Sequence, residues 1–435
     1  MKRILLFLFV CLPLGIRAAQ QDSIRELLRR NPELRGGSST LYRYTPQRYT
    51  PAPQGFEAFH IEHIGRHGSR THASPTLDKQ LRDQLAAADS AGLLTPKGKR
   101  LLTDLKTLCD RMYRRYGDLT RRGREQHRQI ARRMYANFPE VFGSAGSVSA
   151  VSTFVPRCAE SMASFVEALK GCNPALQITP ETSRAFDTFL RFNQGEEYQQ
   201  YLHGPVWRKE YDAYAASLLD PARLLKTLLK NGSTATIPDP KAFMIGLYSL
   251  AAIMPNTDFG LSFYDYFTEE EQFALWRIAN LREYLLKMNS ATSRGLSIDM
   301  AKPLVRQMLD STQEAVDGGE VCAVLRFGHG EDTMPLAVIL GIEGLEVCEP
   351  DPAKVYLAWQ DFDTNPMAAN IQWILYRNAA GRVLIKVLLN EREVALPLPP
   401  VAGPYYDWED FRTCYGEKIS RMPDMTPLPE VKTGF

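Results

Sequence analysis

The spacing of apolar residues predicts alternating strands and helices in the first third of the chain. Positions 56–64 and 147–154 are short apolar-rich runs that predict strands. Between them, apolar residues three or four positions apart predict helices over 77–85, 97–116 and 119–137. Such alternation is typical of an α/β fold.

From about position 180 to 317 the apolar spacing is helical throughout. The expected helices are 207–229, 241–253, 269–288 and 298–316. Thr268 and Glu271 form a capping box at the start of the third helix, and Gly318 follows the fourth. This stretch is therefore predicted to be a helical insertion.

The chain returns to strands after the insertion. The apolar run 321–327 is typical of a buried parallel strand, and 371–376 and 383–389 flank a turn. We expect an α/β fold with a three-layer sheet-and-helix core, an inserted helical cap domain and a late β-hairpin. The expected boundaries are a signal peptide at 1–19, an N-terminal arm without its own core at 20–55, core at 56–179, helical cap at 180–317 and core again at 318–435.

The first residues predict export. Lys2 and Arg3 precede the apolar run 4–16, and Ala18 and Ala19 follow it, as in a secretory signal peptide. The run is too short to be a comfortable membrane anchor, and no later stretch is long and apolar enough to cross a membrane. We therefore expect a periplasmic or secreted protein.

Composition and charge exclude several partner classes. Hydrophobic residues make up 44% and charged residues 23% of the 435 residues, as in ordinary globular proteins. Loss of the signal peptide, with Lys2, Arg3 and Arg17, lowers the net charge from +2 to −1. A nearly neutral chain gives no reason to expect nucleic acid or membrane binding. Six cysteines remain, which permits disulfides without indicating their pairing, and none has CxxC spacing.

The segment from Arg66 to Arg70 (RHGSR) carries the most specific chemistry. Arginine offers a planar fork of donors that fits phosphate oxygens, and neutral imidazole is a competent nucleophile. His67 lies between Arg66 and Arg70, beside Gly68, where a side chain would crowd an approaching group. The pattern predicts phosphoryl transfer through a phosphohistidine.

Three predicted strands end in segments of this kind. His67 follows the first, Arg157 follows the second, and His329 with Glu331 follows the strand at 321–327. Ligands of open α/β sheets bind outside the carboxyl ends of the strands. If these strands are neighbours, the histidines, arginines and glutamate converge on one pocket.

The motifs resemble those of the histidine acid phosphatases in the histidine phosphatase superfamily, most closely the multiple inositol polyphosphate phosphatase group. The matching pieces are RHGSR at 66–70, LTxxG at 119–123, Arg157 in STFVPR, FGHGE at 327–331 and NPMAAN at 365–370. Many acid phosphatases and phytases have an aspartate directly after the second histidine. Here Gly330 occupies that place, and His329-Gly330-Glu331 is similar to the His-Ala-Glu of the inositol polyphosphate group.

The resemblance implies a role for each matching residue. His67 would be the nucleophile, and Arg66, Arg70, Arg157 and His329 would hold the phosphate. Glu331 would protonate the leaving group and then activate water, with Asp332 as the fallback donor. No metal or cofactor is expected, and the substrate would be a small inositol polyphosphate such as phytate. The arginines would lower the pKa of Glu331 while burial would raise it, and the sequence leaves that balance open.

Other interpretations of these residues stay open. His60, His63 and His67 are alternative zinc ligands, although the glycines around them disfavour the helix that such spacing needs. Arg157 could alternatively form a surface salt bridge instead of binding phosphate. Arg124, Arg128 and Arg132 share a helical face that is either a basic ridge for a polyphosphate or, more commonly, a solvated face.

Rival functions also stay open. A broad-specificity acid phosphatase would use the same residues, and a phosphoglycerate-mutase-like transferase shares the RHG motif. An exported protein that binds phosphorylated ligands without hydrolysis would need the arginines but no nucleophile or acid. The sequence does not indicate the oligomeric state.

Overall fold

The structure is a computed structural model that describes residues 23–143, 146–190 and 195–426. The predicted signal peptide, residues 1–19, lies outside the described residues. None of the six cysteines in the described ranges forms a disulfide. No helix in the described ranges is long and apolar enough to span a bilayer.

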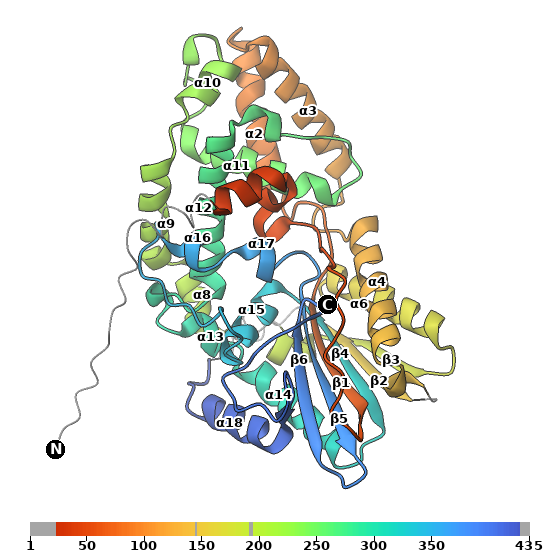
Figure 1. Ribbon diagram of the computed structural model, residues 1–435. Coiled ribbons are helices and arrows are strands. Elements are labelled where there is room, and N and C mark those ends of the chain that lie inside the picture. Colours follow the sequence, from red (N-terminus) through yellow and green to blue (C-terminus); the bar gives the residue numbers. More distant parts are fainter. Residues whose placement is uncertain (1–22, 144–145, 191–194, 427–435) are drawn as a thin grey trace, which may run out of the picture.

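An eight-stranded mixed sheet forms the centre of the core (Figure 1). The strands follow the order β3-β2-β4-β1-β5-β6-β7, and β8 pairs with β6. Their bounds are β1 Phe56–Arg66, β2 Ser147–Ser152, β3 Gln177–Thr182, β4 Val321–Gly328, β5 Asn370–Asn378, β6 Val383–Leu389, β7 Arg392–Glu393 and β8 Tyr406–Asp407. Strands β3, β2, β4 and β1 are parallel to one another, whereas β5 and β6 form the predicted antiparallel hairpin beside β1.

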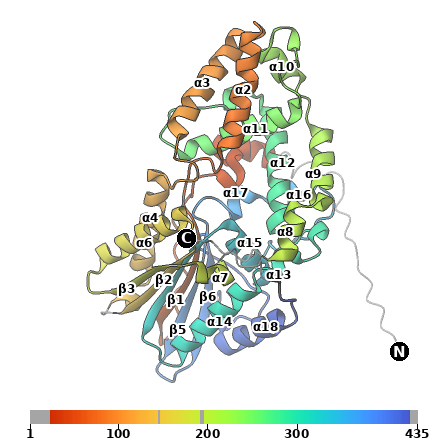
Figure 2. The same cartoon turned by 180° about the vertical axis from the view of Figure 1, so that it is seen from behind.

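Helices cover both faces of this sheet, which confirms the predicted α/β core (Figures 1 and 2). Helices α4 (Arg121–Asn137), α5 (Pro139–Phe142) and α6 (Pro156–Cys172) pack on one face. Helices α14 (Lys302–Val316) and α18 (Trp408–Ser420) pack on the other.

A helical cap lies beyond the carboxyl ends of the parallel strands (Figure 1). It combines α2 (Pro75–Ser90) and α3 (Pro96–Met112) with later helices, because α2 packs against α11 and α3 against α10. The remaining helices are α7 Asp187–Leu190, α8 Glu196–His203, α9 Pro205–Leu218, α10 Ala222–Leu228, α11 Pro240–Ile253, α12 Glu269–Lys287, α13 Leu296–Asp299, α15 Gly330–Ile339, α16 Val355–Ala358 and α17 Asp361–Thr364. Short 3₁₀ turns lie at Pro32–Ser39, Arg184–Phe186, Lys230–Gly232, Met254–Asn256, Tyr264–Tyr266 and Ala291–Ser293.

Several element boundaries differ from those expected. The helix predicted over 207–229 is two helices, α9 and α10, because Pro221 cannot continue the hydrogen-bond ladder. The helix expected over 298–316 likewise divides into α13 and α14, with Pro303 in the first turn of α14. Strand β3 was missed because it is an almost fully exposed edge strand with no buried face to produce a pattern.

The N-terminal arm joins the core of the molecule. A helix at 23–30 and the 3₁₀ turn Pro32–Ser39 bury Leu28 and Leu34 in the larger hydrophobic cluster. The arm thus packs on the cap and core and brings Ser38 to the end of β1.

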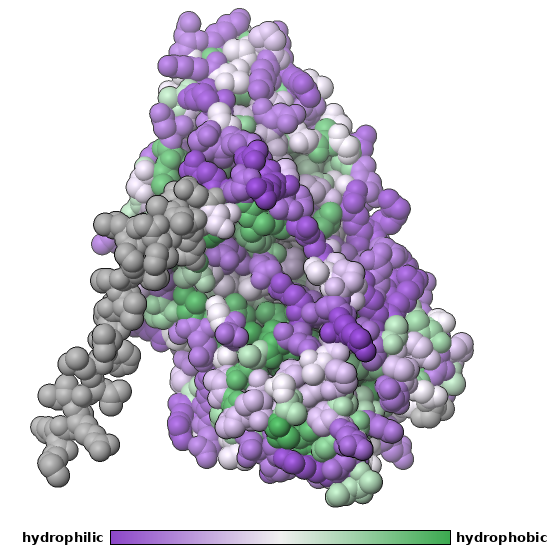
Figure 3. All heavy atoms as spheres, viewed as in Figure 1, coloured by the Kyte–Doolittle hydropathy of each residue, from purple (hydrophilic) through white to green (hydrophobic). Residues whose placement is uncertain are grey.

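The exterior is mostly polar on the face shown in Figure 3, with apolar residues in small groups. The large exposed apolar residues of the described chain are Leu27, Tyr113, Val206 and Val401, which are far apart in sequence.

Candidate active site

A cavity of about 830 Å³ lies where the ends of the parallel strands face the cap. All six predicted site residues line it. They are Arg66, His67, Arg70, Arg157, His329 and Glu331. We call the wall built by the strand ends the core side, and the wall built by α9, α11 and α12 the cap side.

The sheet order explains this convergence. Strand β4 lies between β1 and β2, and all three are parallel, so their carboxyl ends meet at one edge. His67 follows β1, and His329 follows β4 as the N-cap of α15. Arg157 lies in the first turn of α6, just after β2. The backbone N–H of His67 also donates to the carbonyl of Gly328, which joins the two histidine segments directly (2.9 Å).

His67 is held in the form that a nucleophile needs. Its Nδ1 lies 2.9 Å from the carbonyl oxygen of Gly68. Because a carbonyl can only accept, Nδ1 carries the hydrogen and Nε2 keeps its lone pair. Burial, together with Arg157, Arg66 and Arg70, holds the pKa of His67 well below its usual value. The imidazole is therefore neutral.

Gly68 is required for a different reason from the one expected. A Cβ at Gly68 would lie 2.5 Å from the carbonyl oxygen of Gly123 in α4, and a Cβ at Gly123 would lie 2.3 Å from that of Ser69. The two glycines therefore let the RHGSR turn and the start of α4 touch backbone to backbone. We expected a side chain at position 68 to crowd an approaching ligand. This reason is wrong, because the atoms that a side chain would meet belong to Gly123 of α4.

The arginines of the core side form a clamp with unused donors. Arg66 donates through Nη1 to the carbonyls of Ser38 (2.7 Å) and Asn365 (2.6 Å). Arg157 Nη2 lies 3.5 Å from Nδ1 of His329. The buried Nε atoms of Arg66 and Arg157 have no hydrogen-bond partner among the described protein atoms. Buried donors without partners are costly, so they favour a bound anion.

Arg157 makes no ion pair among the described residues, contrary to the salt-bridge alternative. The clamp is also strongly cationic. Burial, then Arg157 and Arg66, lower the pKa of Arg70. A phosphate in the clamp would relieve that repulsion.

Glu331 lies on the core side, 3.6 Å from Nζ of Lys287. Burial raises the pKa of Glu331, but Lys287, His329 and Arg66 together hold it well below its usual value. The carboxyl is therefore ionised in this structure, which resolves the balance that the sequence left open. A Cβ at Gly330 would lie 2.7 Å from Oδ1 of Asn365, so a glycine before Glu331 lets the Asn365 side chain pack closely against the backbone there.

Asp332 has a different task from Glu331. Its carboxylate accepts the backbone N–H of His329 and so caps α15. It is buried and is absent from the lining of the cavity. The placement favours Glu331 over Asp332 as the donor.

Besides the six predicted residues, the cavity is lined by charged residues that the sequence did not indicate. Arg282, Glu283 and Lys287 on α12 line the cavity, as does Asp361 at the start of α17. Burial and the neighbouring Glu283 raise the pKa of Asp361 to about 7. None lies in a motif, and charged residues on a helix ordinarily predict a solvated face.

The basic helical face on α4 is such a solvated face. Each of its three arginines pairs with a glutamate, and none lines the cavity. The pairs are Arg124–Glu160, Arg128–Glu167 and Arg132–Glu125.

The three histidines weighed as zinc ligands point to different surroundings. His60 contacts Glu62 and the carbonyl of Val321, whereas His63 packs against the rings of Phe165 and Phe327. Within the described residues no group of three or more His, Cys, Asp or Glu could hold a metal.

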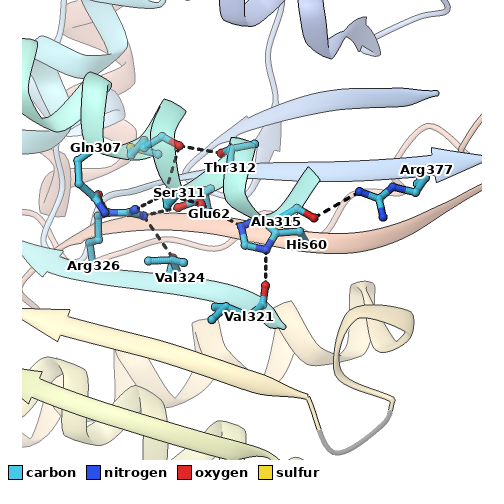
Figure 4. A network of polar contacts seen from close by, with 11 residues as sticks. His60, Glu62, Gln307, Ser311, Thr312, Ala315, Val321, Val324, Arg326 and Arg377 are labelled. Carbon is cyan, nitrogen blue, oxygen red and sulfur yellow. Dashed lines mark hydrogen bonds and ion pairs between the residues drawn. The ribbon is translucent and has the colours of Figure 1, made fainter. Parts of the chain in front are cut away.

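A buried polar network lies beneath the core side (Figure 4). Glu62 of β1 pairs with Arg326 of β4, and both side chains are fully buried. Gln307 and Ser311 of α14 accept further hydrogen bonds from Arg326. The network joins the two strands that end in His67 and His329, and so supports their register.

The chain from 60 to 390 matches the model of the histidine phosphatase superfamily, branch 2. The chain belongs to this superfamily. The predicted enzyme class, a histidine phosphatase, is thereby confirmed, and the roles of the six residues stay predictions.

Known relatives of this histidine phosphatase are consistent with the assignment. Multiple inositol polyphosphate phosphatase 1 of Gallus gallus is 25% identical over 342 residues, which cover 70% of this chain and 72% of that protein. The Bifidobacterium longum multiple inositol polyphosphate phosphatase in complex with inositol hexasulfate has the same fold, with a TM-score of 0.77 and 20% identity over 88% of this chain and 97% of that chain. The phytase from D. castellii matches with a TM-score of 0.62 and 15% identity, covering 90% of this chain and 86% of that chain.

Proposed function

We propose that this histidine phosphatase hydrolyses inositol polyphosphates, phytate among them, through a covalent phosphohistidine. The observation that carries the proposal is the neutral His67 imidazole, with its hydrogen on Nδ1, inside a clamp of arginines whose buried donors lack partners. The names of the relatives supply the substrate class.

The first half of the reaction forms the phosphoenzyme. Nε2 of His67 attacks phosphorus while Arg66, Arg70, Arg157 and His329 stabilise the charge on the equatorial oxygens. The negative charge of the bound phosphate offsets the cations around Glu331 and raises the pKa of its carboxyl toward the protonated form. The bond from phosphorus to the ester oxygen then breaks, and Glu331 gives its proton to the leaving alkoxide.

The second half releases orthophosphate. Glu331, now a carboxylate, takes a proton from water, whose oxygen attacks phosphorus and breaks the bond to Nε2. The imidazole and the protonated carboxyl are thereby restored. All of these steps use residues of the core side and require no metal.

A broad-specificity phosphatase is the second candidate, because part of the cap side is apolar. Ile245, Tyr248, Ile253 and Ile278 line the cavity there and suit an apolar leaving group. Comparing kcat/KM for phytate and p-nitrophenyl phosphate separates the candidates. A clear preference for phytate is expected, and similar values would favour broad specificity.

The covalent step is tested by His67→Ala. Hydrolysis should fall by about 10⁴-fold or more, as for loss of a catalytic nucleophile, while inositol hexasulfate still binds by calorimetry. His203→Ala, at an exposed histidine on α8, is the matched control. An unchanged rate in His67→Ala would reject the mechanism.

We also propose that the protein acts outside the cytoplasm, on the strength of the pattern at residues 2–19. Fractionation should find the mature protein in the periplasm or medium, beginning near residue 19 or 20. Recovery of an intact N-terminus in the cytoplasm would contradict export.

A further inference from the structure

Lys287 is a buried cation at the border between the cap side and the core side. It is the last residue of α12 and lines the cavity, and its side chain is 9% exposed. Its Nζ lies 2.6 Å from Oε2 of Glu283 and 3.6 Å from Oε1 of Glu331. Burying an ammonium is costly unless it is paired, and Glu283 provides that pairing. The approach to Glu331 is a second contact, with the residue proposed to protonate the leaving group.

The position of Glu331 determines what Lys287 can meet. A proton donor must contact the ester oxygen that leaves. On an inositol ring, a substituent on the carbon next to the ester is separated from the ester oxygen by two ring carbons. It therefore lies close to any group that contacts the donor. An ammonium has three N–H donors, and its two carboxylate contacts leave one for a substrate oxygen.

We propose that Lys287 is a specificity-determining residue that binds a phosphate next to the scissile ester, so that vicinally phosphorylated substrates are preferred. The proposal rests on the proposed function, since it requires Glu331 to act at the leaving oxygen. An inositol polyphosphate offers a vicinal phosphate, whereas an inositol monophosphate offers only a hydroxyl. The same core-side chemistry would then discriminate by the charge of the neighbouring group.

Binding of that phosphate would also change the pKa of the proton donor, Glu331. The charged and titratable groups that face Glu331 are Lys287 and Glu283 on α12, Arg66 and Arg70 at the end of β1, His329 before α15, and Tyr198 on α8. Lys287 is the leading charge that lowers the pKa of Glu331. A vicinal phosphate would share this cation and add negative charge, so the pKa of Glu331 would rise toward the protonated form that the first step needs.

The test compares two substrates with the same leaving ring, phytate and myo-inositol 1-phosphate, in wild type and Lys287→Met. Loss of a charged hydrogen bond should lower kcat/KM for phytate by about 10- to 100-fold, with a much smaller loss for the monophosphate. Lys287→Arg, which keeps the charge, should retain most of the preference. The pH at which monophosphate hydrolysis declines should move upward in Lys287→Met, because Glu331 loses its leading cation.

Two controls separate this role from a structural one. Lys386→Met removes a buried lysine that pairs with Glu393 on β7 and does not line the cavity, and should leave the preference unchanged. If Lys287→Met fails to fold, the double variant Lys287→Met/Glu283→Gln removes both charges of the pair and should show the same loss of preference.

The outcomes are distinguishable. Equal losses for both substrates, with an unmoved pH limb, would overturn the role of Lys287 and leave the proposed function intact. If the wild-type enzyme has a similar kcat/KM for the monophosphate and for phytate, the result would contradict both the proposed substrate class and the role of Lys287.

Discussion

The two sides of the cavity are built in different ways. On the core side, His67, Arg157 and His329 each lie within five residues of the end of a parallel strand. On the cap side, Ile245 and Ile278 belong to long helices whose positions depend on how the cap packs. The core side is fixed by backbone hydrogen bonds and strand order, and the cap side by side-chain packing.

The two sides are therefore suited to different tasks. In the proposed mechanism, attack, charge stabilisation and proton transfer need atoms held to a fraction of an ångström, and strand ends are suited to provide that precision. The cap side combines apolar residues with Arg282 and Lys287, which suits the choice among leaving groups. We expect core-side changes to alter the rate for every substrate whose leaving group needs a proton, and cap-side changes to alter which substrate is preferred.

After His67→Ala, Glu331→Gln should give the largest effect. Hydrolysis of phytate should slow by about 10²- to 10⁴-fold, the usual contribution of a positioned acid. Release of p-nitrophenol in the first turnover of p-nitrophenyl phosphate should slow far less, because this leaving group needs no proton, whereas later turnovers still need Glu331 to activate water. Asp332→Asn is the control next in sequence, and should cost about 1 kcal/mol of stability through the cap of α15 without this dependence on the leaving group. Equal losses for both substrates in the first turnover of Glu331→Gln, which reports formation of the phosphoenzyme, would show that Glu331 is not the donor.

The core side could be predicted from sequence because its residues follow strands. Once the apolar runs before His67 and His329 were interpreted as parallel strands, the topology required their ends to meet if they were neighbours. Lys287 and Asp361 could not be found in this way, because nothing in the local sequence places α12 or α17 over those strand ends. Gly68 shows a third case, in which the motif was identified but its neighbour, Gly123, is 55 residues away in sequence.

The core side should also be the acid-sensitive part of the molecule. His63 and His127 lie beneath it, and burial lowers the pKa of each to about 3. Their value in the unfolded chain is near 6.5, so the unfolded state binds more protons between these limits. Stability is therefore full above about pH 6.5 and falls as the pH drops toward 3, by up to about 1.4 kcal/mol per pH unit for each histidine.

Urea unfolding at several pH values checks this slope. His127→Leu removes one titrating group and should flatten the acid decline, whereas His203→Leu, at an exposed site, should not. An unchanged slope in His127→Leu would remove His127 from the explanation.

Gly68→Ala should damage the core side by overpacking. The added methyl would meet the backbone of Gly123, which cannot yield as a flexible side chain would. We expect a loss of about 1–3 kcal/mol of stability by chemical denaturation, with lower kcat as the RHGSR turn shifts. Gly416→Ala in α18 meets no atom within 4 Å and should stabilise by about 0.5–1 kcal/mol. Equal stability of Gly68→Ala and wild type would mean that the turn can move away from α4.

Arg282→Gln should have the smallest effect and tests the comparison most directly. Its side chain is 48% exposed, so solvent and salt screen its attraction for a substrate phosphate, and a contribution of up to about 1 kcal/mol is expected. The KM for phytate should rise by up to about fivefold with kcat almost unchanged, and the difference should shrink in about 0.5 M salt. A large loss of kcat instead would mean that the cap side takes part in the chemistry. The division between a core side that carries out the chemistry and a cap side that selects the substrate would then fail, because both sides would have to be positioned for the transition state.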